Sequence, residues 1–94
     1  MINTIFKTSD SIKNGRSLND IFTYTIAEIG ELAEEVNIVT GYSSKQPGTD
    51  GIVGEAIDSI ICLVDLIKNY QPNISEDEIN YILNKKLQKW YNKN

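Results

Sequence analysis

Two pairs of acidic residues have the side-chain types and the spacing that could hold a metal ion. Glu28 and Glu31 are three residues apart, and so are Glu55 and Asp58. Residues at positions i and i+3 of a helix project from one side, so each pair presents two carboxylates together. If the two helices pack against each other, four carboxylates converge. Their repulsion is costly unless a cation lies between them.

The available ligand chemistry favours a hard divalent cation. Carboxylate oxygens are typical ligands of Mg²⁺ and Mn²⁺. The chain has no histidine, which disfavours a di-iron carboxylate bundle, a site normally built with Glu-x-x-His. The alternative interpretation is that both acidic pairs are solvated faces of amphipathic helices.

Acidic residues are concentrated in the middle of the chain. Between residues 17 and 67 there are nine acidic residues and one basic residue, Lys45, whereas segments 1–16 and 68–94 each carry a net charge of about +2. An acidic centre with basic ends suits a metal-bound polyanion, because the carboxylates hold cations and lysines can contact phosphates. The same acidic centre is a poor match to nucleic acid, so no nucleic acid polymer is predicted as a partner.

Capping signals and apolar spacing predict the first of three long helices. It begins after the capping box formed by Ser17 and Asp20, runs to about residue 39 and is stopped by Gly41. Residues 40–51 are rich in turn formers and are predicted to be a loop. Apolar residues at helical spacing are expected to form the buried face of this helix, namely Phe22, Ile26, Ile29, Ala33 and Val36.

The second and third helices are predicted over about residues 51–69 and 76–91. Asp50 is expected to cap the second helix, Pro72 bars its continuation, and a capping box of Ser75 and Glu78 opens the third. Segment 1–16 is either an extended arm or a short helix. The apolar positions of the second helix are Val53, Ile57, Ile60, Ile61, Val64 and Ile67. The third helix is expected to bury an apolar face made of Ile79, Ile82, Leu83, Leu87 and Trp90.

Four further residues beside the acidic pairs carry weaker expectations. Glu34 and Asp65 lie off the two pairs and are expected to be surface charges. Gly30 and Gly54 each precede a carboxylate inside a helix, where glycine is unfavourable, and this suggests that a backbone or ligand approaches closely.

These elements predict one all-α domain over residues 1–94, a bundle of three main helices completed by homo-oligomerisation, because a chain of 94 residues buries only a small core. The longest apolar run, residues 60–64, is far shorter than a membrane span, and no signal peptide is evident. A lone cysteine, Cys62, is expected to be a small buried hydrophobe and fits a reducing compartment. The chain is therefore predicted to be cytoplasmic, with no membrane partner.

Together, Glu28-x-x-Glu31 and, 23 residues later, Glu55-x-x-Asp58 resemble the ExxE…ExxD pattern of the MazG-like all-α nucleoside triphosphate pyrophosphohydrolases. Residues 27–35 are similar to the family's first metal-binding helix, 54–58 to its second and 86–90 to the basic C-terminal segment of many members. The resemblance spans about residues 17–91. Ala27, where MazG-type members often carry another Glu, places the chain nearer the dCTP pyrophosphatase-like branch. Cys62 occupies a position where some members of the family have an aromatic residue near the nucleotide base.

The resemblance implies a homodimer or homotetramer that uses Mg²⁺, or Mn²⁺ in its place, to hydrolyse a (d)NTP to the monophosphate and pyrophosphate for nucleotide pool control. Glu31, or alternatively Glu35, would orient or deprotonate the attacking water. The implied metal ligands are Glu28, Glu31, Glu55 and Asp58, and the lysines expected to contact phosphates are Lys45, Lys86 and Lys89.

Two other classes of function stay open. The same fold could keep metal and nucleotide and act as a non-catalytic sensor or sequestering protein. The chain could also be a structural helical oligomer or regulatory partner without metal. The base and sugar of the nucleotide and the size of the oligomer are not fixed by the sequence.

Overall fold

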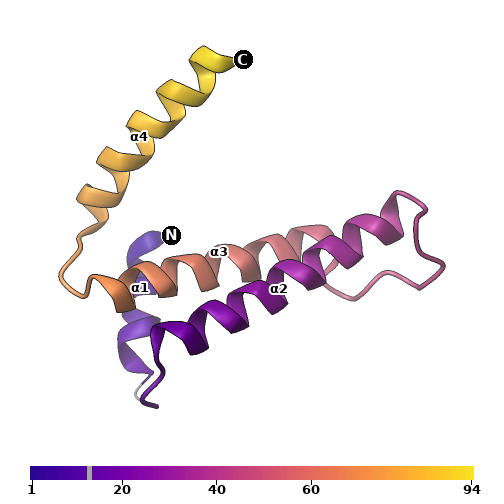
Figure 1. The fold of residues 1–94 in the computed structure, drawn as a ribbon, viewed down its shortest axis with the longest axis horizontal. Coiled ribbons are helices and arrows are strands. Elements are labelled where there is room, and N and C mark those ends of the chain that lie inside the picture. The colour runs from indigo at the N-terminus through magenta and orange to yellow at the C-terminus, as the bar shows by residue number, and fades with distance from the viewer. Residues whose placement is uncertain (13) are drawn as a thin grey trace.

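Four α-helices form the part of the chain that this computed structural model describes, residues 1–12 and 14–94. They are α1 (Ile2–Ser11), α2 (Leu18–Val39), α3 (Gly51–Tyr70) and α4 (Glu76–Lys93). No strand occurs among the described residues, which confirms the all-α class. The helices α2 and α3 form a long antiparallel hairpin, α1 crosses one end of it, and α4 projects away (Figure 1). None of the described helices is long and apolar enough to cross a membrane.

The starts of α2 and α4 follow the predicted capping boxes. The Ser17 hydroxyl accepts a hydrogen bond from the backbone N–H of Asp20 at 3.0 Å, and the Asp20 carboxylate accepts from the N–H of Ser17 at 3.0 Å. Ser75 and Glu78 make the same reciprocal pair at α4. Asp50 stands at the predicted N-cap position of α3, but its side chain makes no capping hydrogen bond. Its backbone is already helical (φ −82°, ψ −26°), whereas a capping residue needs an extended backbone.

The apolar core lies where α1 meets α3. Phe6, Val64 and Ile74 are buried together, and four partly buried residues surround them, namely Ile2, Ile5, Ile60 and Ile79. Segment 1–16 was predicted to be either an extended arm or a short helix. It contains a helix, α1, which ends at Ser11 and covers the C-terminal half of α3. The core holds the end of the hairpin that lies opposite the loop of residues 40–50.

The contact between α2 and α3 is not made by the predicted apolar face of α2. The buried residues of α2 are Ile21, Thr25 and Glu35, none of which belongs to the predicted face, and the small polar Thr25 and Ser59 are among the most deeply buried residues of the hairpin. The Thr25 hydroxyl donates to the Ile21 carbonyl at 2.8 Å, and the Ser59 hydroxyl donates to the Glu55 carbonyl at 3.0 Å. Because each hydroxyl is satisfied within its own helix, these small side chains can be buried between the helices at little cost.

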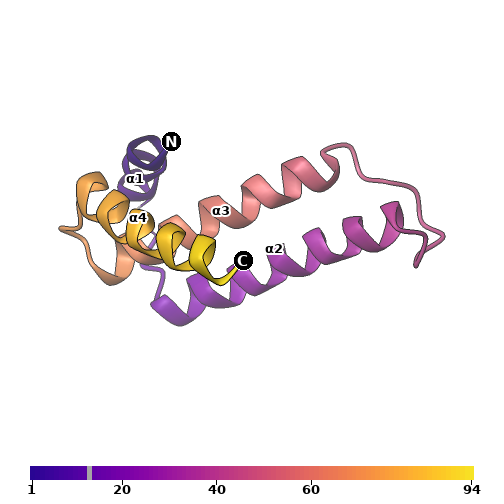
Figure 2. The ribbon, with the colours of Figure 1, turned by 90° about the horizontal axis from the view of Figure 1, so that it is seen from above.

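The prediction that α4 buries an apolar face is wrong for the single chain. No residue of α4 is buried; Ile79 is half-buried, and the rest of the predicted face is exposed. The helix is joined to the body at its start, where the backbone N–H and side-chain amide of Asn3 donate to the Glu76 carboxylate at 3.1 and 3.2 Å. In the view from above, α4 starts beside α1 and overlaps the hairpin in projection (Figure 2), whereas the side view shows it rising away from α2 and α3 as a separate arm (Figure 1).

Candidate functional site

Three of the four predicted metal ligands converge between α2 and α3. One carboxylate oxygen from each of Glu28, Glu31 and Glu55 lies within 4.8 Å of those from the other two. Asp58 belongs to a second group, in which its oxygen, one from Glu55 and one from Asp50 are equally close. Glu55 is therefore shared, and the two groups form one continuous carboxylate cluster of five side chains.

Two oxygens of this cluster are buried without a hydrogen-bond donor. They are Oε2 of Glu28 and Oε2 of Glu55. Burial raises the pKa of the Glu55 carboxyl, and repulsion from Glu31, Asp58, Glu28 and Asp50 raises it further. Buried acceptors without donors cost free energy, and neighbouring anions add to that cost. The cluster thus has the donor set and the uncompensated negative charge that a hard divalent cation fits.

Asp50 is a cluster member that the sequence analysis missed, because it was assigned to helix capping. A β-carbon on Gly54 would collide with the side chain of Asp50, so the missing side chain of Gly54 makes room for it. A close approach does occur at Gly54, but the neighbour is this side chain and not the backbone or ligand that was expected. At Gly30 the expectation is wrong for the single chain, where nothing lies within 4 Å of a built β-carbon.

Glu35, the alternative candidate for the general base, is held against the loop that joins α2 to α3. One carboxylate oxygen, Oε1, accepts a hydrogen bond from the backbone N–H of Gly48 at 2.6 Å, while Oε2 is buried without a donor. A β-carbon at Gly48 would lie 2.5 Å from Oε1, so a larger residue there would require the carboxylate or the loop to shift. Glu35 is 7% exposed, whereas Glu31 is exposed to solvent within the cluster. The loop anchor is therefore Glu35, and the more accessible carboxylate is Glu31.

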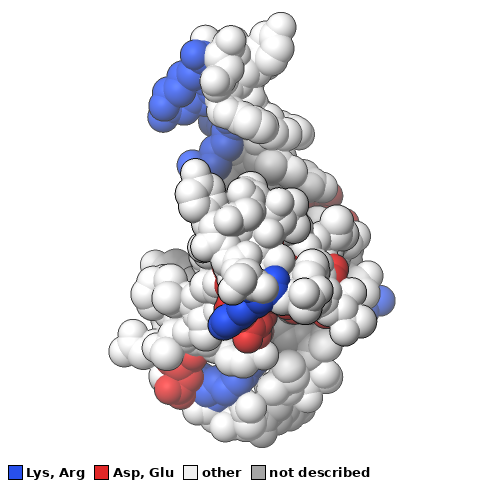
Figure 3. Space-filling model, turned by 90° about the vertical axis from the view of Figure 1, so that its right-hand side faces the viewer, with Lys and Arg blue, Asp and Glu red and all other residues white. Residues whose placement is uncertain are grey.

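The three predicted phosphate-binding lysines are not gathered at the cluster. Lys45 is paired with Glu34 at 2.8 Å, and both side chains are largely exposed. This confirms Glu34 as a surface charge. Lys86 and Lys89 lie on α4, and neither makes an ion pair with a described residue. Viewed from the loop end, basic side chains are seen on the projecting helix, while the hairpin body carries acidic and basic side chains together (Figure 3).

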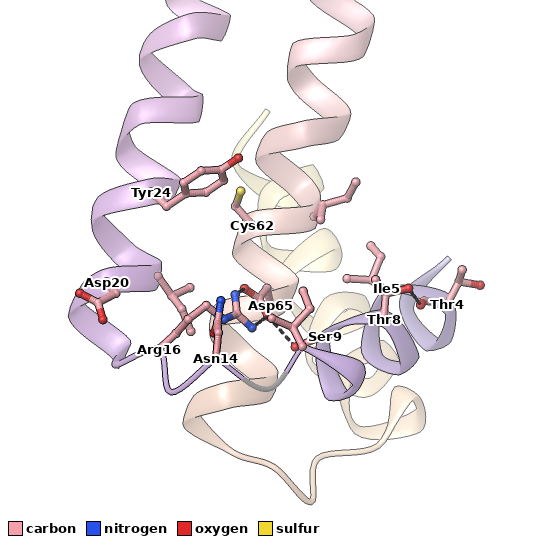
Figure 4. Close-up of a pocket in the computed structure, with 13 residues that line it drawn as sticks. Thr4, Ile5, Thr8, Ser9, Asn14, Arg16, Asp20, Tyr24, Cys62 and Asp65 are labelled. Carbon is pink, nitrogen blue, oxygen red and sulfur yellow. Dashed lines mark hydrogen bonds and ion pairs between the residues drawn. The ribbon is translucent and has the colours of Figure 1, made fainter.

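A cavity of about 640 Å³ lies beside the cluster, between α1, α2 and α3. Tyr24 and Cys62 face each other across one end of it (Figure 4). Interaction with the Glu28 carboxylate raises the pKa of Tyr24. Burial raises the pKa of the Cys62 thiol, and the charges of Glu28, Asp65 and Asp58 raise it further. This end of the cavity therefore adjoins the carboxylate cluster, about one helical turn away along each helix.

The wall of the cavity also contains a compensated carboxylate, Asp65. Asp65 accepts hydrogen bonds from both terminal nitrogens of Arg16 at 2.6 and 3.2 Å, and from the Ser9 hydroxyl at 2.5 Å. Asn69 adds a bond at 3.0 Å. Burial alone would raise the pKa of Asp65, but these donors outweigh burial and lower it. Asp65 is thus a half-buried structural anion, not the surface charge that was expected.

Cavity and cluster together form an elongated site with two chemically different halves. Apolar side chains such as Ile5, Ile21 and Ile61 line much of the cavity, with a few polar groups among them. Small-molecule sites are typically built in this way. A ligand that fills both halves needs a largely apolar body at one end and a group at the other that can share a cation with carboxylates. No protein family, curated protein or solved structure is found to match this chain.

Proposed function

We propose that the chain is a Mg²⁺-dependent nucleoside triphosphate pyrophosphohydrolase that converts a (d)NTP and water to the monophosphate and pyrophosphate. The observation that carries the proposal is the convergence of Glu28, Glu31 and Glu55 with buried carboxylate oxygens that lack donors. The adjoining cavity supports a substrate that joins a ring system to a chain of phosphates.

Each part of the site has a role in this proposal. Glu28, Glu31, Glu55 and Asp58 hold the cation. When bound, Mg²⁺ supplies positive charge that offsets the charge developing on phosphate oxygens. The exposed Glu31 is best placed to orient or deprotonate the attacking water, because the Glu35 carboxylate already accepts a hydrogen bond from the backbone N–H of Gly48. The cavity between Tyr24 and Arg16 receives the nucleoside.

The contacts between phosphates and three lysines, Lys45, Lys86 and Lys89, stay predictions. Lys45 would have to leave Glu34, an exchange that costs little because exposed ion pairs contribute about 0–1 kcal/mol. Lys86 and Lys89 project with α4 away from the hairpin (Figure 1). We infer that these two lysines would reach phosphates only through a homodimer or homotetramer, in which α4 of one copy lies near the cluster of another.

The test is a turnover assay of the purified protein with Mg²⁺ against a panel of NTPs and dNTPs, measuring both the monophosphate and pyrophosphate. Glu55→Gln and Asp58→Asn are expected to abolish turnover and not merely raise KM, because the cluster acts as a unit. Glu34→Gln, a matched removal of one acid outside the cluster, is expected to change activity by no more than a few-fold.

Two outcomes would overturn the assignment in different ways. If the wild type binds a triphosphate with Mg²⁺ and hydrolyses none in the panel, the chain is a sensor or sequestering protein. If Asp58→Asn turns over normally, the cluster is not the catalytic site.

A further inference from the structure

Helix α4 is attached to the rest of the chain by its first turn and is otherwise uncovered. Asn3 donates two hydrogen bonds to the Glu76 carboxylate, and Ile79 packs beside the core residues Phe6 and Ile74. Beyond this turn the helix projects from the hairpin (Figure 1), and none of its residues is buried. The accessible surface of the chain, 7148 Å², exceeds the value of about 5,500 Å² for a compact monomer of 10.6 kDa. The projecting helix therefore offers surface that a partner can cover.

Local interactions stabilise α4 in the absence of such cover. Ser75 and Glu78 close the capping box at its start, and the three acids of its first turn and Lys93 in its last turn suit the helix dipole. Within the helix, the Lys85 ammonium lies 4.6 Å from the centre of the Tyr81 ring. Most helices depend on tertiary packing for their stability, whereas α4 depends on these interactions. It is thus a preformed helical surface.

One side of this helix carries an apolar stripe. At 100° per residue, the positions of Ile79, Leu83, Leu87 and Trp90 fall within about 80° of one another around the axis. Leu83, Leu87 and Trp90 are 46%, 44% and 66% exposed. Their spacing of four and then three residues is that of the apolar positions of a coiled coil, where each side chain fits between side chains of a facing helix. Because Ile79 joins the stripe to the core, a helix laid on the stripe would extend the core.

The stripe has a basic border on one side only. Lys86 and Lys93 lie within about 40° of its edge, whereas the opposite border carries uncharged side chains such as Asn80 and Asn84. Residues 79–94 contain four lysines and no acidic residue. In paired helices, charged residues beside the apolar seam select the partner. The basic border therefore calls for a partner with carboxylates beside its own apolar stripe.

We propose that α4 is a docking arm for an acidic amphipathic helix of another protein. The apolar stripe of the partner packs on Leu83, Leu87 and Trp90, and carboxylates beside that stripe pair with Lys86 and Lys93. Exposed tryptophan is among the residues that contribute most to binding once they are covered. Because α4 is already helical, binding orders little of this chain, and this favours affinity. The proposal rests on neither metal nor nucleotide, although Lys86 cannot contact a phosphate and this partner at once.

Two other occupants fit the charges less well. A second copy of α4 brings the same four lysines and no acid beyond its first turn. An anionic membrane surface attracts lysines, but helices that lie on membranes carry basic residues across their polar face. In α4 a large part of that face is made of neutral amides, and the first turn is acidic. These amides are Asn80, Asn84, Gln88 and Asn92.

Fluorescence of Trp90, the only tryptophan of the chain, reports directly on the stripe. The probes are two synthetic amphipathic peptides without tryptophan, both with leucine at the apolar positions of their heptads. One carries glutamate beside the leucine stripe and the other carries lysine. The acidic peptide is expected to shift the Trp90 emission to shorter wavelength and to saturate at micromolar concentration. The basic peptide is expected to cause no shift at the same concentrations.

Three variants locate the interaction. Leu83→Glu puts a charge in the stripe and is expected to weaken binding of the acidic peptide at least about 10-fold. Lys86→Glu reverses the charge of the border, so it is expected to weaken the acidic peptide about 10-fold and to permit binding of the basic one. Lys85→Glu, the matched control, makes the same change on the far side of α4. It is expected to alter binding by less than about 3-fold, because at physiological salt charges are screened beyond about 8 Å.

Four results would overturn the proposal. The first is a failure of the acidic peptide to bind, and the second is equal binding of the two peptides, which would show that the lysines select nothing. A Trp90 shift caused by phosphatidylglycerol vesicles, but not by the acidic peptide, would assign α4 to a membrane surface. The same shift on concentrating the protein alone would assign α4 to a second copy of the chain.

Discussion

Two groups of acidic side chains lie on the same helical hairpin and differ in what surrounds them. Asp65 is held by Arg16, Ser9 and Asn69, whereas the cluster around Glu55 has no basic partner among the described residues and includes buried oxygens without donors. The pKa of Asp65 is lowered and that of Glu55 is raised. A carboxylate is thus structural in one part of the site, at Asp65, and charged without compensation in another, around Glu55.

This difference separates a carboxylate that stabilises the fold from carboxylates whose negative charge is uncompensated. A group whose pKa is lowered on folding stabilises the folded state at neutral pH, and a carboxyl whose pKa is raised destabilises it there. Natural chains retain such unfavourable charge most often at functional sites. The contrast with Asp65 is therefore the main reason to interpret the cluster as a metal site and not as two solvated faces.

The largest stability effect is expected from removing the partner of Asp65. Arg16→Met leaves a half-buried carboxylate without its bidentate cation and is expected to cost about 2 kcal/mol of unfolding free energy, measured by urea denaturation. Glu34→Gln breaks the exposed pair with Lys45 and, as the control, is expected to change stability by less than about 0.5 kcal/mol. Equal effects of the two changes would mean that Asp65 is no better anchored than a surface charge.

An intermediate effect is expected at Glu35, which has one satisfied oxygen and one without a donor. Gly48→Ala would force the loop away from the Glu35 carboxylate and lose that hydrogen bond, at a cost of about 1 kcal/mol. Gly30→Ala adds the same methyl group inside α2 where nothing lies within 4 Å, and is expected to stabilise by about 0.5–1 kcal/mol. Thermal melting of both variants measures the difference, and a neutral Gly48→Ala would contradict the anchoring role.

The smallest and most specific effect is expected from neutralising Glu55 without metal. Glu55→Gln removes repulsion, so the metal-free variant is expected to melt slightly above the wild type at neutral pH. The sign follows from linkage: the raised folded-state pKa makes Glu55 favourable below its unfolded pKa, and this contribution is lost as pH rises through the folded value. The advantage of the variant should therefore shrink as the pH is lowered to the ordinary glutamate pKa of about 4.3 and below. Melting curves at both pH values test this, and a variant that is destabilised at neutral pH would contradict it.

The sequence predicted local features well and side-chain partners poorly. Capping boxes at Ser17 and Ser75 and the stop at Gly41 depend on nearby residues and agree with the structure. The acidic pairs were found because two residues that are three positions apart lie on the same side of a helix. Burial was predicted from apolar spacing alone. It failed for Phe22 because Ile21 and Thr25, on a neighbouring stripe of α2, are buried in its place, and it failed for Trp90 because α4 projects away from the hairpin.

The remaining errors involve contacts between distant parts of the chain. Asp65 looked like a surface charge because its partner Arg16 is 49 residues away, in a connection with no helical pattern. Asp50 looked like a cap because its position before Gly51 is typical of one. The place of Asp50 in the cluster depends on how the loop brings the chain back to the start of α3. The small size of Gly54, which makes room for the Asp50 side chain, was the signal that could have indicated this place.

The central claim, that the cluster is a divalent cation site, is tested most directly by calorimetric titration of Mg²⁺ and Mn²⁺ into the wild type and Glu55→Gln. Glu55 belongs to both groups of converging carboxylates, so its loss should remove binding more completely than any other single change. Saturable binding to the wild type, absent from Glu55→Gln and retained by Glu34→Gln, is the predicted result. No binding to the wild type at millimolar cation, or equal binding to Glu55→Gln, would show that these carboxylates are only a solvated acidic face.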